Sequence, residues 1–396
     1  MVPKVGFKAD LSLKIPEEYL KRRSLSSDTE FFLSERNGDL ILHPIKRDVR
    51  KLYIEPTTKC NLKCLFCIRN IWGDPLEHMS LQTFEKIRES IPDLPNLDQV
   101  VFGGFGEPLS HPRILEMIES MREFGLKVSL STNGVLLTPG IAKELIRLGV
   151  ERIIISIDGS PETYLRIRGS ILSKVLENIE NLNKAKLETG SPYPVLEIEF
   201  VVLKSNLKEL AGIVDIAPKL GVSTVIVSNV LAYTEDMVAE RLYTYEPQPP
   251  IKASGGWPLR MDVWLQHGTL KLPRLFLSAE RRCRFVSDNS VVIAWDGGIS
   301  PCYALSHSYS YFTLDGRKKF VSRYLLGNIN EKPLGEIWTS KEYVIFRSVV
   351  KAFYFPSCYS CDLRQTCDLR EQNQGCWGWN PSCADCLWAQ DIIICP

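Results

Sequence analysis

Apolar and polar residues follow two different periods between residues 51 and 232. Short apolar runs rich in β-branched residues predict strands at 51–56, 98–103, 127–131, 151–157, 195–203 and 222–231. Between these runs, apolar positions recur at helical spacing, which predicts helices near 80–91, 112–124, 139–148, 161–188 and 207–220. Alternation of strand and helix is typical of an α/β protein with a parallel sheet and right-handed crossovers. The pattern fits either an open doubly wound sheet or a partial (β/α)6 barrel.

Both architectures bind ligands at the carboxyl ends of their strands, and small or polar residues follow several of the predicted strands. These residues are 103–108 (GGFGEP), 131–134 (STNG) and 156–159 (SIDG). Each segment alone would pass for an ordinary turn, because Asn-Gly and Asp-Gly pairs are common in turns. Their coincidence at one edge of the sheet predicts a ligand site there.

The loop after the first predicted strand carries Cys60, Cys64 and Cys67. On a helix these thiols would spread over more than ~10 Å, so a loop around a compact cluster suits the spacing better. Four thiolates normally saturate a cubane iron–sulfur cluster, so three would leave one iron free to bind another molecule. Two other interpretations are a zinc site completed by His78 and a disulfide. The disulfide requires an oxidising compartment, yet the N-terminus lacks the features of a secretory signal peptide.

The remaining nine of the twelve cysteines all lie beyond residue 282. They are Cys283, Cys302, Cys358, Cys361, Cys367, Cys376, Cys383, Cys386 and Cys395. A zinc ribbon on the two CxxC pairs at 358–361 and 383–386 would explain four of them and leave five without a role. Together with the alternation of strands and helices, the uneven distribution predicts an N-terminal extension at 1–50, an α/β unit at 51–232, a linker or lid at 233–282 and a cysteine-rich domain at 283–396.

The net charge and the lengths of the apolar runs argue against two classes of binding partner, nucleic acids and membranes. The net charge of the 396 residues is +1, without the concentrated basic charge of nucleic-acid-binding proteins. No apolar run approaches the ~20 residues that span a bilayer. We therefore expect a cytoplasmic protein that binds neither nucleic acid nor membrane.

The motifs around the three clustered cysteines resemble those of the radical S-adenosylmethionine (SAM) superfamily. The resemblance covers residues 51 to about 232 and rests on the CxxxCxxC loop with Phe66 before its last cysteine. It also includes FGEP at 105–108 in place of the usual GGEP, the STNG and SIDG segments, and RIRG at 166–169. It implies a partial (β/α)6 barrel whose Cys60, Cys64 and Cys67 hold a [4Fe–4S] cluster that SAM chelates through the open iron.

The resemblance also implies roles for residues around SAM. Glu107 would accept from the SAM amino group, and Arg168 would pair with its carboxylate, since a guanidinium matches a carboxylate in bidentate geometry. Polar contacts to the ribose and its surroundings would come from Ser131, Asn133, Ser156 and Asp158. Phe66, Phe105 and Gly106 complete the predicted SAM site. Because Phe105 replaces a glycine, the backbone there departs from the family pattern.

The cysteine-rich end resembles the SPASM extension of radical SAM enzymes, which carries one or two auxiliary [4Fe–4S] clusters. Two clusters need eight thiolates, so one of the nine is left over. By position, Cys283 and Cys302 would belong to the first cluster, and the second would take Cys358, Cys361 and Cys367. We expect Cys376 and Cys383 to complete the first cluster and Cys386 the second, although Cys395 is a further candidate ligand.

The resemblance implies a function as well. A low-potential donor such as ferredoxin or flavodoxin would reduce the cluster, SAM would be cleaved to a 5′-deoxyadenosyl radical, and that radical would abstract hydrogen from a substrate. Residues 375–390 resemble the tail of radical SAM maturases associated with tungsten-containing aldehyde oxidoreductases, so the substrate would be a tungstopterin cofactor or its host enzyme. One alternative is a SPASM enzyme that modifies a peptide or protein. The other is a non-catalytic electron carrier, which would have no use for Glu107, Asp158 or Arg168.

Overall fold

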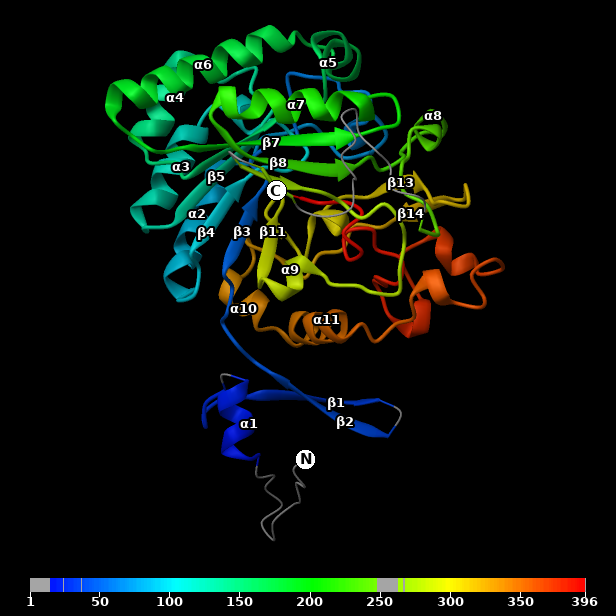
Figure 1. Cartoon of the computed structure of the whole chain (residues 1–396). Helices are drawn as coiled ribbons and strands as arrows, with labels where there is room; N and C mark the ends of the chain where they lie inside the picture. The colour runs from blue at the N-terminus through cyan, green and yellow to red at the C-terminus, as the bar shows by residue number, and fades with distance from the viewer. Residues whose placement is uncertain (1–14, 24, 37, 248–262, 266–267, 396) are drawn as a thin grey trace.

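A single sheet of eleven strands runs through the computed structural model (Figure 1), which describes residues 15–23, 25–36, 38–247, 263–265 and 268–395. Its central strands are β3 (Lys51–Ile54), β4 (Gln99–Phe102), β5 (Lys127–Thr132), β6 (Arg152–Ser156), β7 (Val195–Val202) and β8 (Val222–Asn229). These six strands are parallel and lie side by side in the order of the chain. Because that order never reverses, the crossovers wind one way, as in a barrel and unlike a doubly wound sheet.

The predicted helices cover the outside of this sheet (Figure 1). They are α2 (Leu81–Ser90), α3 (Ile114–Glu123), α4 (Pro139–Arg147), α5 (Pro161–Arg168), α6 (Leu172–Thr189) and α7 (Leu210–Ile216), which short 3-10 turns flank. One prediction was wrong: the single helix expected at 161–188 is two helices. Gly169 ends α5 in the left-handed conformation, with φ of +67°, and the chain turns before α6 begins.

Side chains of β7 show that the sheet has two different faces, one packed in the hydrophobic core and one lining a cavity. Ile198 and Phe200 are fully buried and belong to the apolar core between sheet and helices. The alternate residues, Glu199 and Val201, line the inner cavity. Since successive strand residues point to opposite faces, the outer face of β7 is apolar and its inner face is available for chemistry.

The sheet continues beyond residue 232 at both edges. On one side β10 (Gly268–Lys271) pairs parallel with β8, and β9 (Val263–Leu265) pairs with β10. On the other side β11 (Ser290–Ile293) pairs parallel with β3, followed by β12 (Gly298–Ser300) and β15 (Gly327–Asn328). Parts of the predicted linker and of the cysteine-rich segment therefore extend the barrel sheet. The division at 232 and 283 stays a prediction, and residues 248–262 and 266–267 of the linker lie outside the described residues.

The rest of the chain forms smaller units around this sheet. The cysteine-rich segment contributes α9 (Arg284–Ser287), the hairpin β13 (Tyr309–Phe312) and β14 (Lys318–Val321), α10 (Leu334–Trp338) and α11 (Lys341–Ala352), and α8 (Glu235–Ala239) precedes β10. At the N-terminus, α1 (Glu17–Arg22) and the hairpin of β1 (Phe31–Arg36) and β2 (Asp39–Pro44) project from the body beside α11 (Figure 1).

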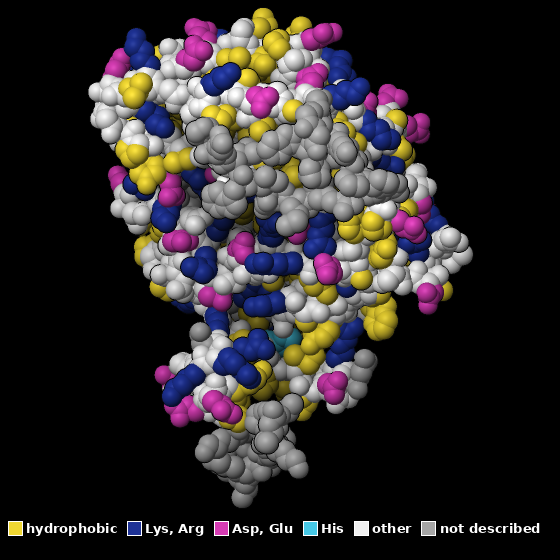
Figure 2. Space-filling view, in the orientation of Figure 1, with side chains coloured by type: hydrophobic (Ala, Val, Ile, Leu, Met, Phe, Trp, Pro, Cys, Tyr) yellow, Lys and Arg dark blue, Asp and Glu magenta, His cyan; other side chains and the backbone are white. Residues whose placement is uncertain are grey.

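The face shown in Figure 2 carries acidic and basic side chains intermixed, as the small net charge predicts. Within the described residues, no helix has the length and apolar character needed to cross a membrane.

We expect buried side chains on the outer face of β7 to contribute strongly to the free energy of unfolding. We expect Phe200→Ala to lower the free energy of unfolding by about 3–5 kcal/mol, because it removes a buried ring and leaves a cavity. Leu187→Ala is the matched control, since that side chain is 83% exposed on α6. Anaerobic urea denaturation measures both variants. Equal losses would contradict the assignment of this strand face to the core.

Candidate active site

A cavity of about 260 Å³ opens at the carboxyl ends of the barrel strands. Eleven of the twelve residues predicted to bind the cluster or SAM line this cavity. They are Cys60, Cys64, Cys67, Phe66, Phe105, Gly106, Glu107, Ser131, Asn133, Ser156 and Arg168. The structure thus brings together loops that follow four strands. Asp158 is the one predicted residue that does not line the cavity.

Backbone and side-chain donors surround the thiols of the first cysteine loop. The Leu62 N–H donates to Cys60 Sγ at 3.4 Å, and the Asn133 amide donates to the same sulfur at 3.7 Å. Burial raises the pKa of Cys60 to about 11 and also raises that of Cys64. Metal ligation requires thiolates, so binding of a metal would release these protons. Donors aimed at sulfur are also what an iron–sulfur cluster uses to adjust its potential, and the set fits such a cluster.

Gly106 allows the FGEP segment after β4 to pack closely against the cysteine loop after β3. A Cβ at this position would overlap with the carbonyl oxygen of Thr57, so a side chain cannot be accommodated without moving backbone. The Glu107 N–H donates to the Lys59 carbonyl at 2.8 Å and fixes the same approach. The glycine of the FGEP segment is therefore required by contact between two loops.

The buried Glu107 carboxyl is held ready to accept a further hydrogen bond. It accepts from the Asn133 N–H at 2.7 Å, the Thr132 hydroxyl at 2.7 Å and the Leu109 N–H at 3.0 Å. Burial raises the pKa of Glu107, and these donors oppose the rise. A carboxylate can accept about four hydrogen bonds, so one position stays open toward the cavity.

Arg168 ends α5 and points toward the cysteine loop. Its Nε donates to Asp158, and its Nη1 lies 4.0 Å from Cys64 Sγ. The guanidinium carbon also lies 5.4 Å from the centroid of the Phe66 ring, within range of a cation–π contact. Asp158 is fully buried and accepts from the Val201 N–H at 2.8 Å. Its place differs from the predicted ribose contact, because both of its oxygens serve to orient Arg168 and β7.

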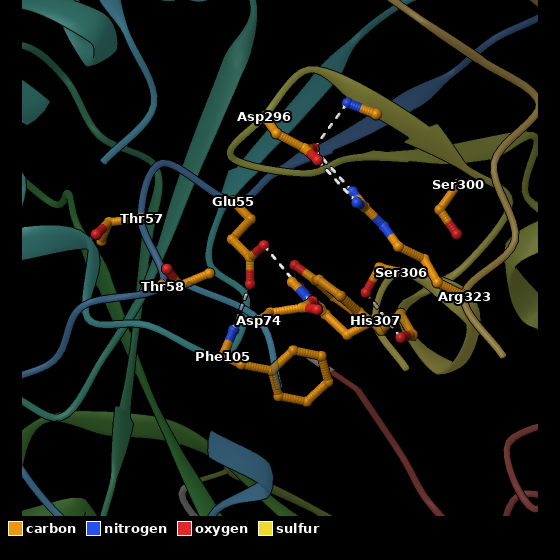
Figure 3. A network of polar contacts seen from close by, with 12 residues as sticks. Glu55, Thr57, Thr58, Asp74, Phe105, Asp296, Ser300, Ser306, His307 and Arg323 are labelled. Atoms are coloured by element: carbon orange, nitrogen blue, oxygen red, sulfur yellow. Dashed lines mark hydrogen bonds and ion pairs between the residues drawn. The ribbon is translucent and has the colours of Figure 1, made fainter. Parts of the chain in front are cut away.

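Sequence reasoning missed His307, which lies fully buried behind the FGEP loop (Figure 3). Its Nε2 lies 2.8 Å from a Glu55 oxygen, and its Nδ1 lies 2.5 Å from an Asp74 oxygen. The other Glu55 oxygen accepts from the Phe105 N–H at 3.0 Å. Burial lowers the pKa of His307, but the two carboxylates outweigh it and raise the pKa above its ordinary value. No local motif marks this histidine, because its partners are more than 200 residues away in the chain.

Phe105, which replaces the family's glycine, packs in an aromatic cluster. Its ring centroid lies 5.8 Å from that of Trp72, 5.5 Å from that of His307 and 6.1 Å from that of Tyr303. Such edge-to-face contacts stabilise more than area burial alone. The substitution is thus accommodated by rings from the cysteine loop and from the C-terminal segment.

The later cysteines fall into two groups and one remaining thiol. Described residues include no three His, Cys, Asp or Glu side chains arranged to hold a single metal ion, so we group the cysteines by the thiols that each one faces. The neighbours of Cys302 are Cys283, Cys383 and Cys386. Those of Cys376 are Cys361 and Cys367, and Cys358 in turn faces Cys376. These neighbours favour a sharing in which Cys376 and Cys386 change places relative to the prediction, and the assignment of ligands stays a prediction. Cys395 lines the cavity described above.

Two family models match the chain, namely the radical SAM superfamily over residues 54–235 and SPASM, an iron–sulfur cluster-binding domain, over 283–362. The "Tungsten-containing aldehyde ferredoxin oxidoreductase cofactor-modifying protein" of Pyrococcus furiosus is 38% identical over 354 residues, which cover 88% of this chain and 97% of that protein. The "AdoMet-dependent heme synthase" of Methanosarcina barkeri is 34% identical over 172 residues, or 42% of this chain and 46% of that protein.

Solved structures share the fold at low sequence identity. Native anSMEcpe with bound AdoMet is 18% identical with a TM-score of 0.53, over 82% of this chain and 92% of that one. SuiB of Streptococcus suis bound to the precursor peptide SuiA is 16% identical with a TM-score of 0.53, over 82% of this chain and 72% of that one. These likenesses support the same architecture of a barrel followed by a cysteine-rich segment.

Substituting Gly106 should damage the site without removing a functional side chain. We expect Gly106→Ala to weaken SAM binding at least about tenfold, because a loss of only ~1.4 kcal/mol has that effect and the added methyl meets backbone. Gly140→Ala is the control, since a Cβ there in α4 meets nothing within 4 Å. Equilibrium dialysis of SAM against the reconstituted proteins measures the difference. Unchanged binding in Gly106→Ala would show that the loop contact is dispensable.

The His307 network should make stability depend on pH. His307→Leu leaves the buried Glu55 carboxylate without its partner, and we expect a loss of about 3–5 kcal/mol in the free energy of unfolding. The raised pKa means that the contribution of His307 is fully present below its ordinary value of 6.5 and is lost as pH rises through the folded-state value. The gap between wild type and variant should therefore narrow at alkaline pH.

Denaturation across this pH range provides the measurement. His43→Leu should show the opposite trend, because burial lowers the pKa of His43. A gap for His307→Leu that stays constant with pH would contradict a charged imidazole.

Proposed function

The chain belongs to the radical SAM superfamily, and on that premise we propose that it is a maturase of a tungsten-containing oxidoreductase. In this proposal it cleaves SAM reductively and abstracts hydrogen from the tungstopterin cofactor or from the enzyme that carries it. The supporting observation is the 38% identity to the Pyrococcus furiosus cofactor-modifying protein across 97% of that protein's length. A match of that extent includes the barrel and the cysteine-rich segment together.

The barrel residues would bind and orient SAM. Cys60, Cys64 and Cys67 would hold a [4Fe–4S] cluster, which would supply the electron for reductive cleavage of SAM. The open acceptor position of Glu107 suits the SAM amino group, and Arg168 brings positive charge beside Cys64. The aromatic rings of Phe105, Tyr233 and Tyr303 line the cavity and would exclude water from the reaction.

Two auxiliary clusters would occupy the cysteine-rich segment. We assign one to the group of Cys302, which contains Cys283, Cys302, Cys383 and Cys386, and one to the group of Cys376, which contains Cys358, Cys361, Cys367 and Cys376. The Arg281 guanidinium lies near thiols of both groups and donates to the carbonyls of Phe355 and Pro356. That arrangement supports a rigid wall between two clusters.

The electron would come from a low-potential carrier such as ferredoxin or flavodoxin. None of the twelve cysteines forms a disulfide with a described residue, which suits a reducing compartment, so we place the protein in the cytoplasm.

The experiment uses an immature tungsten oxidoreductase produced without this protein. We expect the anaerobically reconstituted chain, with SAM and a reductant, to form 5′-deoxyadenosine and to change the mass of the extracted pterin cofactor. A Cys60/Cys64/Cys67 triple alanine variant should do neither, and its iron should fall from about twelve to about eight per chain.

Each outcome of this experiment separates the candidates. A mass change confined to the polypeptide would favour a protein-modifying SPASM enzyme. Deoxyadenosine without any mass change would remove the tungsten proposal and keep the radical enzyme. No deoxyadenosine from fully loaded wild type would favour an electron carrier.

A further inference from the structure

Nine cysteines lie beyond residue 282, and two cubane clusters use eight. The thiol outside both groups belongs to Cys395, near the end of the chain. It lines the same cavity as Cys60, Cys64 and Glu107. Figure 1 shows the C-terminus at the centre of the molecule beside β8. The end of the cysteine-rich segment is therefore part of the wall of the SAM cavity.

Specific hydrogen bonds hold Cys395 there. The Asn229 amide donates to the Ile392 carbonyl at 2.9 Å, and the Ile394 N–H donates to the Ser228 hydroxyl at 3.0 Å. Both anchors lie at the carboxyl end of β8. The Trp388 indole N–H then donates to Cys395 Sγ at 3.2 Å and fixes the position of the sulfur.

A second reactive group of the cavity is Glu199, on the inner face of β7. It lies opposite Ser156 in the register of the sheet. Its carboxyl makes no hydrogen bond or ion pair with any residue that the structure describes, although charged Arg168 and Asp158 are near. Burial raises the pKa of Glu199 to about 7, so the group can hold or release a proton near neutral pH.

Both Glu199 and Cys395 line the cavity, and the Glu199 carboxyl is close enough to Cys395 to favour its protonated thiol. Burial raises the pKa of Cys395 to about 12, and the Trp388 hydrogen bond opposes this rise. A cysteine thiol that binds no metal carries its hydrogen at neutral pH, and an S–H bond is weaker than an ordinary alkyl C–H bond.

We propose that Cys395 is a catalytic residue whose thiol donates a hydrogen atom to a carbon-centred radical in this cavity. The S–H bond breaks, a C–H bond forms, and the sulfur is left as a thiyl radical. One electron from the low-potential reductant and one proton from the Glu199 carboxyl restore the thiol, and Glu199 regains its proton from water. This role is independent of the tungsten proposal, because it needs only the radical that SAM cleavage produces.

The test needs no added substrate. Reconstituted protein in D2O, with SAM and dithionite, forms the 5′-deoxyadenosyl radical, and the exchanged Cys395 S–D is a deuterium source for it. Wild type should yield 5′-deoxyadenosine with one carbon-bound deuterium. Cys395→Ala and Cys395→Ser should lose that label, whereas Leu363→Ala, an exposed change in the same segment, should keep it.

Iron and sulfide content provides a readout that does not depend on activity. All three variants should keep the iron content of wild type. Loss of about four irons from the Cys395 variants would identify a cluster ligand and overturn the proposal. Label that persists in iron-complete Cys395 variants would overturn it as well.

Glu199→Gln tests the return of the proton. We expect this variant to give a labelled first turnover, because the thiol is intact, and to slow in later turnovers. Later turnovers at the wild-type rate would overturn the role of Glu199.

Discussion

The site depends on one close contact between two loops. The FGEP segment packs so tightly against the cysteine loop that position 106 has no room for a Cβ, and the Glu107 N–H bonds to Lys59. This contact places the Glu107 carboxyl and the Cys60 thiol on the same cavity. A metal-bound ligand and its acceptor must be held within a fraction of an ångström, and backbone-to-backbone contact provides that rigidity better than long side chains would.

Around this contact the protein buries several charges, each of which needs a partner. Glu55 faces His307, Asp158 faces Arg168, and Glu107 is satisfied by neutral donors. Burial of an unpaired charge is costly, and even in a buried pair the cost of desolvation offsets much of the attraction between the charges. These pairs therefore contribute little net stability, but they fix which atoms point toward the cavity. Glu199 departs from this rule, because its carboxyl lines the cavity and makes no hydrogen bond or ion pair with any described residue. That exception is what the chemistry of a substrate site would require.

The sequence could predict those parts of the fold that depend on the local spacing of apolar residues. Six strands and the helices between them follow from apolar spacing. Most of the predicted SAM-site residues lie at the carboxyl ends of strands or in the loops that follow them, so topology gathers them. The break at Gly169 was missed because an apolar period continues across it. Strands β10 and β11 were missed because each is four residues long and pairs with a strand distant in the chain.

The same limit explains His307 and Cys395. His307 follows Cys302 without a motif, and its meaning depends on Glu55 and Asp74, which approach it only after β11 has paired with β3. Counting thiols showed that one was surplus, but only the tertiary structure shows which one and where it lies. Pairing information of this kind is not contained in a single sequence, because any of several cysteines satisfies the count.

The C-terminal segment, which matches an iron–sulfur cluster-binding domain, is therefore also a structural part of the candidate active site. It adds β11 to the barrel sheet, supplies Tyr303 and His307 behind the FGEP loop, and ends in the cavity at Cys395. Tyr53 of the barrel and Phe285 of this segment pack in one apolar cluster. Because packing and catalytic geometry are shared, an auxiliary cluster that orders this segment also orders the SAM site. Metal binding in the tail and SAM binding in the barrel would then be thermodynamically linked, since each would favour the same folded arrangement.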